Sequence, residues 1–155
     1  MKNLPKSVQE FLKGESLAVA GVSRDGKQPA NHIFKRLVDS GFQVYPVNPK
    51  ASEVEGVRCY PDVVSLPDGV HGVVVATPPG AAVQVVRECG ERGIGHVWFH
   101  RSFGEGSVSA EALQECEKLG IECIAGGCPM MFCEPVDIAH KCMRWWLQRG
   151  GRVPK

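Results

Sequence analysis

The fold is decided by the stretch LAVAGVSRDGK, residues 17–27. Its first half is a short apolar run of small and β-branched residues, which is typical of a strand buried on both faces of a parallel sheet. The run ends at Gly21 and is followed by a polar loop, by Pro29 and by an amphipathic segment at residues 31–39. A strand, a glycine turn and a helix start in this order leave backbone N–H groups that can bind an anion. The stretch therefore predicts the first unit of a nucleotide-binding α/β sheet.

Similar apolar runs alternate with amphipathic segments along the rest of the chain. Expected strands are residues 17–20, 42–47, 72–76, 96–99 and 121–125, with a short edge strand at 57–60. Expected helices are one within residues 1–14, where Ser7 and Glu10 have capping-box spacing, and others at 29–40, 80–92, 109–119 and 134–148. This alternation predicts a Rossmann-like α/β fold, with one doubly wound, mostly parallel sheet of five or six strands in a single domain over residues 1–155.

Composition narrows the class of protein. A net charge of +1 over 155 residues argues against a nucleic-acid binder, which usually carries a basic excess. The sequence has no apolar stretch long enough to cross a membrane, and residues 1–6 lack the apolar core of a signal peptide. Seven cysteines, an odd number, favour free thiols in a reducing compartment. We therefore expect a cytoplasmic protein with a small-molecule ligand, no nucleic acid and no membrane partner.

Ligands of doubly wound sheets bind beyond the carboxyl ends of the strands, where the strand order reverses. The loop after the first strand keeps Gly21 and Gly26 of a dinucleotide fingerprint but has Ser23 in place of the middle glycine. Such a longer, polar loop suits a phosphate held by the Ser23 hydroxyl and by backbone amides. The alternative interpretation is an ordinary turn between a strand and a helix.

The second strand ends in Asn48-Pro49-Lys50 and offers no acidic residue. NAD sites usually place a carboxylate at this position, where it accepts hydrogen bonds from the ribose hydroxyls. A cation there would instead attract a phosphorylated ribose, either the 3′-phosphate of coenzyme A (CoA) or the 2′-phosphate of NADP. Alternatively, Lys50 is a solvated surface lysine.

Several motifs together resemble a known family. They are residues 19–24, residues 44–50, Cys59-Tyr60-Pro61, Thr77-Pro78-Pro79 and Gly127-Cys128-Pro129. The chain is similar in these motifs to stand-alone CoA-binding proteins and to the N-terminal domain of the succinyl-CoA synthetase α subunit and of NDP-forming acyl-CoA synthetases. The resemblance runs from about Phe11 to Met131. The chain departs from the family pattern at Gly127, at residues 130–132 and at residues 100–104.

The resemblance implies a site for CoA or an acyl-CoA. The residues that it assigns to the site are Gly21, Val22, Ser23, Arg24, Lys27, Asn48, Pro49, Lys50, Ala76, Thr77, Pro78, Pro79, Cys128 and Pro129. In this assignment residues 21–23 lie against the CoA phosphates, and Arg24 or Lys27 adds charge. Lys50 lies near the 3′-phosphoribose, residues 76–79 form a wall over the adenine or the pantetheine entry, and Cys128 lies near the end of the thiol arm.

No catalytic constellation is evident in the sequence. His100, next to Arg101, is the best-placed acid or base, but it lacks a nucleophile partner. The large synthetases of the superfamily use a phosphorylated histidine in a domain that this chain is too short to include. We therefore expect a non-catalytic binding, carrier or sensor module, with a partner enzyme chain as one option. An NADP-binding oxidoreductase or redox sensor remains an alternative.

The cysteines support a further alternative, a thiol or metal protein. Cys116, Cys123, Cys128 and Cys133 follow one another closely, although without the tight spacing of usual metal sites. Cys128 follows a strand and precedes a proline, and a helix N-terminus there would lower its pKa. A mixed disulfide between Cys128 and CoA is the hypothesis that follows.

The last expected helix carries Met143, Trp145, Trp146 and Leu147, which is more apolar surface than one buried face needs. Core packing against the sheet is the first interpretation, and a homodimer contact is the second.

Overall fold

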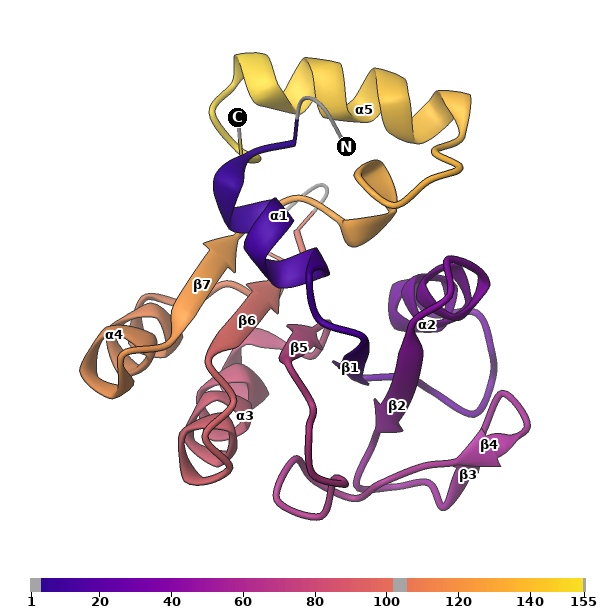
Figure 1. Ribbon diagram of the computed structural model, residues 1–155, viewed down its shortest axis with the longest axis vertical. Helices are drawn as coiled ribbons and strands as arrows, with labels where there is room; N and C mark the ends of the chain where they lie inside the picture. Colours follow the sequence, from indigo (N-terminus) through magenta and orange to yellow (C-terminus); the bar gives the residue numbers. More distant parts are fainter. Residues whose placement is uncertain (1–3, 102–105, 155) are drawn as a thin grey trace.

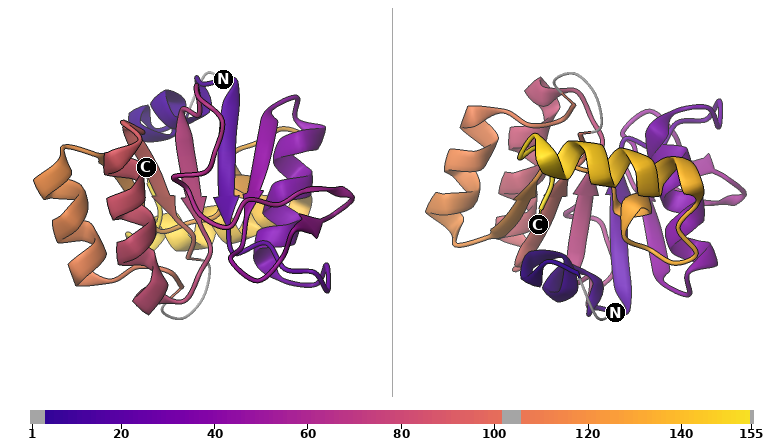
Figure 2. Two further views of the ribbon diagram at one scale, coloured as in Figure 1. Left: turned by 90° about the horizontal axis from the view of Figure 1, so that it is seen from below. Right: turned by 90° about the horizontal axis from the view of Figure 1, so that it is seen from above.

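A computed structural model gives the architecture and describes residues 4–101 and 106–154. A five-stranded, fully parallel sheet lies at its centre, in the order β2-β1-β5-β6-β7 (Figures 1 and 2). The strands are β1 (Ser16–Ala20), β2 (Gln43–Val47), β5 (Gly72–Val75), β6 (His96–Phe99) and β7 (Glu122–Ala125). The predicted Rossmann-like α/β sheet is confirmed.

Helices cover both faces of this sheet (Figure 2). They are α1 (Lys6–Leu12), α2 (Pro29–Asp39), α3 (Pro79–Glu91), α4 (Ala110–Leu119) and α5 (Ile138–Arg149), with a single 3-10 turn, η1 (Pro129–Met131). Alternate residues of β1 face opposite ways: Leu17 and Val19 pack in the core under α1, α2 and α5, while Ala18 and Ala20 pack in the core under α3 and α4. This alternation explains why the strand is apolar throughout.

Two expectations about local structure are wrong. The Ser7–Glu10 capping box does not form, because the N-cap of α1 is Pro5, two residues before Ser7, and has no side-chain cap. The expected short edge strand at 57–60 is instead part of a separate antiparallel hairpin, β3 (Glu53–Val54) and β4 (Val57–Arg58). Glu55 and Gly56 turn this hairpin with positive φ angles of 50° and 75°. Only Tyr60 reaches the main sheet, through one bridge to Val47.

No helix within the described residues combines the length and apolar character that crossing a membrane requires.

Candidate functional site

The strand order reverses between β1 and β5. From β1 the chain crosses to β2 on one side and then returns to β5 on the other, so the loops after β1 and β5 lie beside each other. Gly21 ends β1 with a φ angle of +104°, and a Cβ atom added to it would lie 2.5 Å from the carbonyl oxygen of Ala76. Only glycine allows this close approach of two backbones, which fixes the floor of the site.

The loop after β1 is held by Asn31, a fully buried polar residue on α2. Its Oδ1 accepts a hydrogen bond from the Ser23 amide (3.0 Å), and its Nδ2 donates to the Ser23 carbonyl oxygen (2.7 Å). The same Nδ2 donates to Glu55 Oε1 (2.8 Å), which ties the β3–β4 hairpin to the loop. This bond, together with the Lys35 ammonium 3.1 Å away, lowers the pKa of Glu55.

Sequence reasoning missed Asn31. The only signal was a polar residue at a position where the helical spacing of Ile33, Phe34 and Leu37 predicts an inward-facing side chain.

Ser23 is already engaged inside its own loop. Its hydroxyl donates to Asp25 Oδ1 at 2.5 Å, and the Lys27 amide donates to the same oxygen at 3.0 Å. Both bonds favour the charged carboxylate and lower the pKa of Asp25. The structure thus shows the Ser23 amide and hydroxyl bound to protein groups, and an anion at the Ser23 hydroxyl would have to replace Asp25 as acceptor.

The loop after β2 is joined to the loop after β1. Asn48 Nδ2 donates to the Val22 carbonyl oxygen (2.8 Å), and Asn48 Oδ1 accepts from the Lys50 amide (2.8 Å). This turn leaves Pro49 and Lys50 exposed. Within residues 4–101 and 106–154, the Lys50 ammonium forms no ion pair. A cation therefore stands on a loop that is hydrogen-bonded to the glycine turn.

Two helices begin next to these loops without a side-chain acceptor for their first amides, although the Asn31 and Ala81 amides donate to the backbone carbonyl oxygens of Gln28 and Pro78. α2 starts at Pro29 and α3 at Pro79, and neither has a side-chain cap or an acidic residue in its first turn. Such helix ends carry a partial positive charge and unpaired N–H groups. The segment leading into α3 is fixed by the buried Ser107, whose hydroxyl donates to the Thr77 carbonyl oxygen at 2.6 Å. Residues 21–23, 48–50 and 76–79 are thus gathered at one edge of the sheet.

Comparison with known proteins decides the family. A model of the CoA binding domain matches residues 15–134. The chain belongs to the CoA-binding domain family. It is 36% identical over 122 residues to the ADP-forming acetate–CoA ligase II of Archaeoglobus fulgidus, covering 74% of this chain and 18% of that one. It is 33% identical over 125 residues to the α subunit of the ADP-forming acetate–CoA ligase II of Pyrococcus furiosus, covering 76% and 27%. The chain thus spans roughly a fifth to a quarter of the curated relatives it matches.

Solved structures agree with this family. A hypothetical protein from Pyrococcus horikoshii OT3 superimposes with a TM-score of 0.76 at 29% identity, covering 88% of this chain and 98% of that one. The dinucleotide-forming acetyl-coenzyme A synthetase 1 of Ca. Korarchaeum cryptofilum, in complex with phosphate and ADP, gives 0.66 at 28% identity, covering 76% and 27%. This architecture therefore occurs both as a small chain and as part of a larger enzyme.

Cys128 of this CoA-binding domain is not the reactive thiol that the sequence suggested. It follows β7, at the sheet edge opposite β2, and both Cys128 and Pro129 are buried. Burial raises the pKa of Cys128 to about 12, and the turn that it begins, η1, is only three residues long. The expected lowered pKa of Cys128 is wrong. The hypothesis of a mixed disulfide with CoA depended on that lowered pKa and therefore loses its physical basis.

A different cysteine has the lowered pKa. The Cys116 thiol on α4 interacts with Cys123 on β7, which lowers the pKa of Cys123 and raises that of Cys116. All seven cysteines are free. Among the described residues, no group of three or more histidine, cysteine and acidic side chains is placed to hold a metal ion.

The remaining candidate, His100, follows β6 and donates its amide to the Val75 carbonyl oxygen. Burial lowers the pKa of its imidazole, which favours the neutral form. Residues 102–104, in the segment at 100–104 that departs from the family pattern, lie outside the described residues.

Proposed function

We propose that this CoA-binding domain holds CoA across the loops that follow β1, β2 and β5. The observation that carries the proposal is the hydrogen bond from Asn48 to Val22, because it fixes the exposed Lys50 turn against the glycine turn. One ligand can then meet a cation and the open N-termini of α2 and α3 together. CoA matches this arrangement, since its 3′-phosphate and its diphosphate are separated by the ribose.

The proposal assigns a role to each loop. Residues 21–23, with Arg24 and Lys27, bind the diphosphate through helix-end amides and positive charge. Asn48, Pro49 and Lys50 receive the 3′-phosphoribose. Residues 76–79 cover the adenine or the pantetheine entry. Cys128 and Pro129 are buried packing residues in this proposal, and neither of them contacts the pantetheine thiol.

We assign binding rather than catalysis to this chain. The part of the curated relatives that it matches is 18% and 27% of their lengths, and the family model that matches residues 15–134 is that of a CoA binding domain. The module would then act as a carrier or sensor of CoA or an acyl-CoA in the cytoplasm, or deliver it to a partner enzyme chain.

Calorimetric titration with four ligands tests the proposal. We expect CoA to bind most tightly and 3′-dephospho-CoA to bind more weakly, because it cannot pair with Lys50. NADP and NAD are expected to bind more weakly still. Tighter binding of NADP than of CoA would favour the oxidoreductase alternative, and equal binding of CoA and its dephospho form would remove the role of Lys50.

A further inference from the structure

The outer face of α5 exposes an unusual amount of apolar surface. In Figure 1, α5 forms the upper edge of the molecule. Leu147 is its buried residue, whereas Ile138 is 79% exposed, Trp145 57% and Trp146 58%. Two adjacent tryptophans in water are costly in a monomer, and exposed apolar patches of this kind mark interaction sites.

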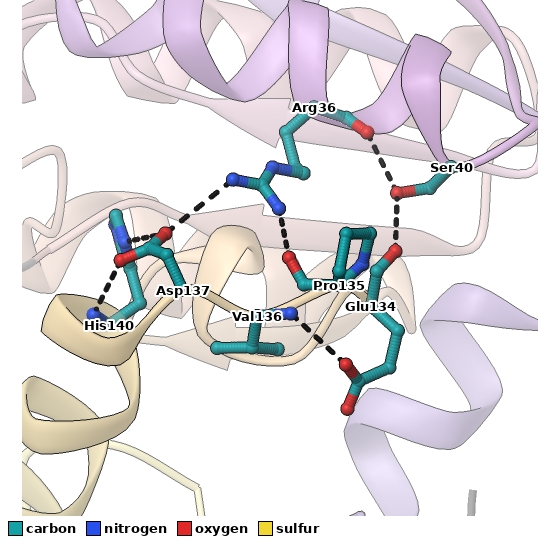
Figure 3. A network of polar contacts seen from close by, with 7 residues as sticks. All are labelled: Arg36, Ser40, Glu134, Pro135, Val136, Asp137 and His140. Atoms are coloured by element: carbon teal, nitrogen blue, oxygen red, sulfur yellow. Dashed lines mark hydrogen bonds and ion pairs between the residues drawn. The ribbon is translucent and has the colours of Figure 1, made fainter.

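This face is held in a fixed orientation at its first end. Arg36 of α2 donates to the Pro135 carbonyl oxygen and lies 3.5 Å from Asp137, while Ser40 Oγ donates to the Glu134 carbonyl oxygen at 3.2 Å (Figure 3). Asp137 in turn caps the helix by accepting from the His140 amide at 3.0 Å.

The last turn of α5 is anchored as well. The Arg152 amide donates to the Leu147 carbonyl oxygen (3.1 Å), and Gln148 Nε2 donates to the Pro154 carbonyl oxygen (3.1 Å). Val153 is buried in the same core as Leu147. The exposed face therefore belongs to an ordered helix fastened at both ends.

Four of the exposed residues of α5 form a stripe with symmetric spacing, and the exposed Trp146 lies beside it. Ile138, Cys142, Trp145 and Arg149 are all exposed and are spaced by four, three and four positions, which places them on one side of the helix. The Arg149 guanidinium lies over the Trp145 ring, 4.0 Å from its centroid. A shallow hollow of about 620 Å³, lined by Lys141, Cys142, Trp145 and Trp146, marks the middle of the stripe.

We propose that this stripe, residues 138, 142, 145 and 149, binds the same stripe of a second copy in antiparallel fashion, forming a two-fold dimer. The symmetric spacing places Cys142 against Trp145 of the other copy and Ile138 against the stem of Arg149. Acidic Glu134 and Asp137 lie before α5, and basic Arg149 and Arg152 lie at its end. Antiparallel packing therefore opposes acids to bases and aligns the helix dipoles favourably, whereas parallel packing would oppose like charges.

The proposed contact between the two α5 helices is small, and its size determines how strongly the dimer associates. A helix of 12 residues is about 18 Å long, so α5 alone offers less than the roughly 1,200–2,000 Å² of a standard stable interface. The dimer is therefore concentration-dependent. α5 lies outside residues 15–134, which match the family model, so the stripe shares no residue with the proposed CoA loops.

Sedimentation velocity over a concentration series is the first test. We expect the apparent mass to rise from the chain mass of 16.8 kDa toward twice that value. Trp145→Asp combined with Trp146→Asp is expected to remain monomeric with an unchanged circular dichroism spectrum. Val64→Asp, at a 42% exposed apolar residue between β4 and β5, is the matched control and should still dimerise.

Cross-linking through Cys142 provides a second, independent measurement. All seven cysteines lie within the described residues, and Cys142 alone among them is exposed. A short bismaleimide is expected to link two wild-type chains, and Cys142→Ser is expected to abolish the link. A wild type that stays monomeric throughout the series overturns the proposal, as does dimer formation that survives the double tryptophan change. A monomer whose tryptophan fluorescence shifts to the blue with phosphatidylglycerol vesicles would show instead that the face binds an anionic lipid surface.

Discussion

The helices of this domain begin in two different ways. α2 and α3 start with Pro29 and Pro79 and have no side-chain cap, whereas α4 and α5 start with Ser109 and Asp137, whose side chains accept the amides of the first turn. The uncapped pair follows β1 and β5, the two strands at the reversal of strand order. The capped pair supports the β6–β7 half. Among α2, α3, α4 and α5, side-chain caps are therefore missing at the two helices where an outside anion could bind the first-turn amides, while α1, which precedes β1, also lacks one.

The largest effect is expected from a substitution at Gly21, where the backbone after β1 closely approaches the backbone after β5. Gly21→Ala is expected to lower the free energy of unfolding by about 3 kcal/mol and to abolish CoA binding, because it combines a positive φ angle with a clash against Ala76. Gly41→Ala is the control, since its φ angle of +93° is strained but no atom lies within 4 Å of the added Cβ. Urea denaturation and calorimetry measure both variants, and equal losses would show that the contact with Ala76 is unimportant.

Releasing the loop from α2 should have the next largest effect. Asn31→Ala removes the side-chain hydrogen bonds to Ser23 and Glu55 and leaves the Ser23 amide without its acceptor. We expect a loss of about 2 kcal/mol in the free energy of unfolding and a CoA affinity at least tenfold lower. Stability that falls while CoA affinity stays unchanged would contradict a positioning role for Asn31.

Removing the Lys50 ammonium should weaken the binding of CoA but not that of 3′-dephospho-CoA. Lys50→Ala is expected to weaken CoA binding about tenfold, or about 1.4 kcal/mol, and to leave 3′-dephospho-CoA binding unchanged. Lys118→Ala, an exposed lysine near the end of α4, serves as the control. Titrations of both ligands against both variants reveal any coupling between Lys50 and the 3′-phosphate, and a uniform loss for both ligands would disprove it.

The capped half should respond in stability alone. Ser109→Ala removes the acceptor of the Ala112 amide and is expected to lower the free energy of unfolding by about 1 kcal/mol, with CoA affinity unchanged. Thermal or urea denaturation measures the first quantity and calorimetry the second. A drop in CoA affinity would mean that the two halves are not independent.

The sequence predicted the sheet well because each of its strands carries its own signal. Continuous apolar runs such as residues 72–75 are buried whatever lies around them, and Gly120 ended α4 in the left-handed conformation that stops helices. The β3–β4 hairpin carried no such signal, because two-residue strands have no periodicity. Its position depends on the Asn31–Glu55 hydrogen bond between residues 24 positions apart.

The loops of the candidate site were predicted in place but not in detail. Gly21 and Asn48 lie in loops at the carboxyl ends of β1 and β2, as the strand pattern predicts, yet nothing local revealed that Asn31 and Asp25 would already bind Ser23. For Cys128, the local sequence suggested a feature that the structure does not have. A proline after a strand end suggested an accessible thiol, while burial in the core that also holds Trp98 and Phe132 depends on segments far apart in the sequence.

Asn31 also limits how this domain can be re-engineered. One carboxamide holds both the glycine loop and Glu55 of the hairpin, so the two segments share a single point of support. A graft that exchanges the hairpin must keep an acceptor at residue 55, or the amide proton facing it loses its partner inside the protein. If the glycine loop and the hairpin are varied in separate libraries, many variants will lose the hydrogen bonds that hold both segments. Residues 23, 31 and 55 should therefore be varied together.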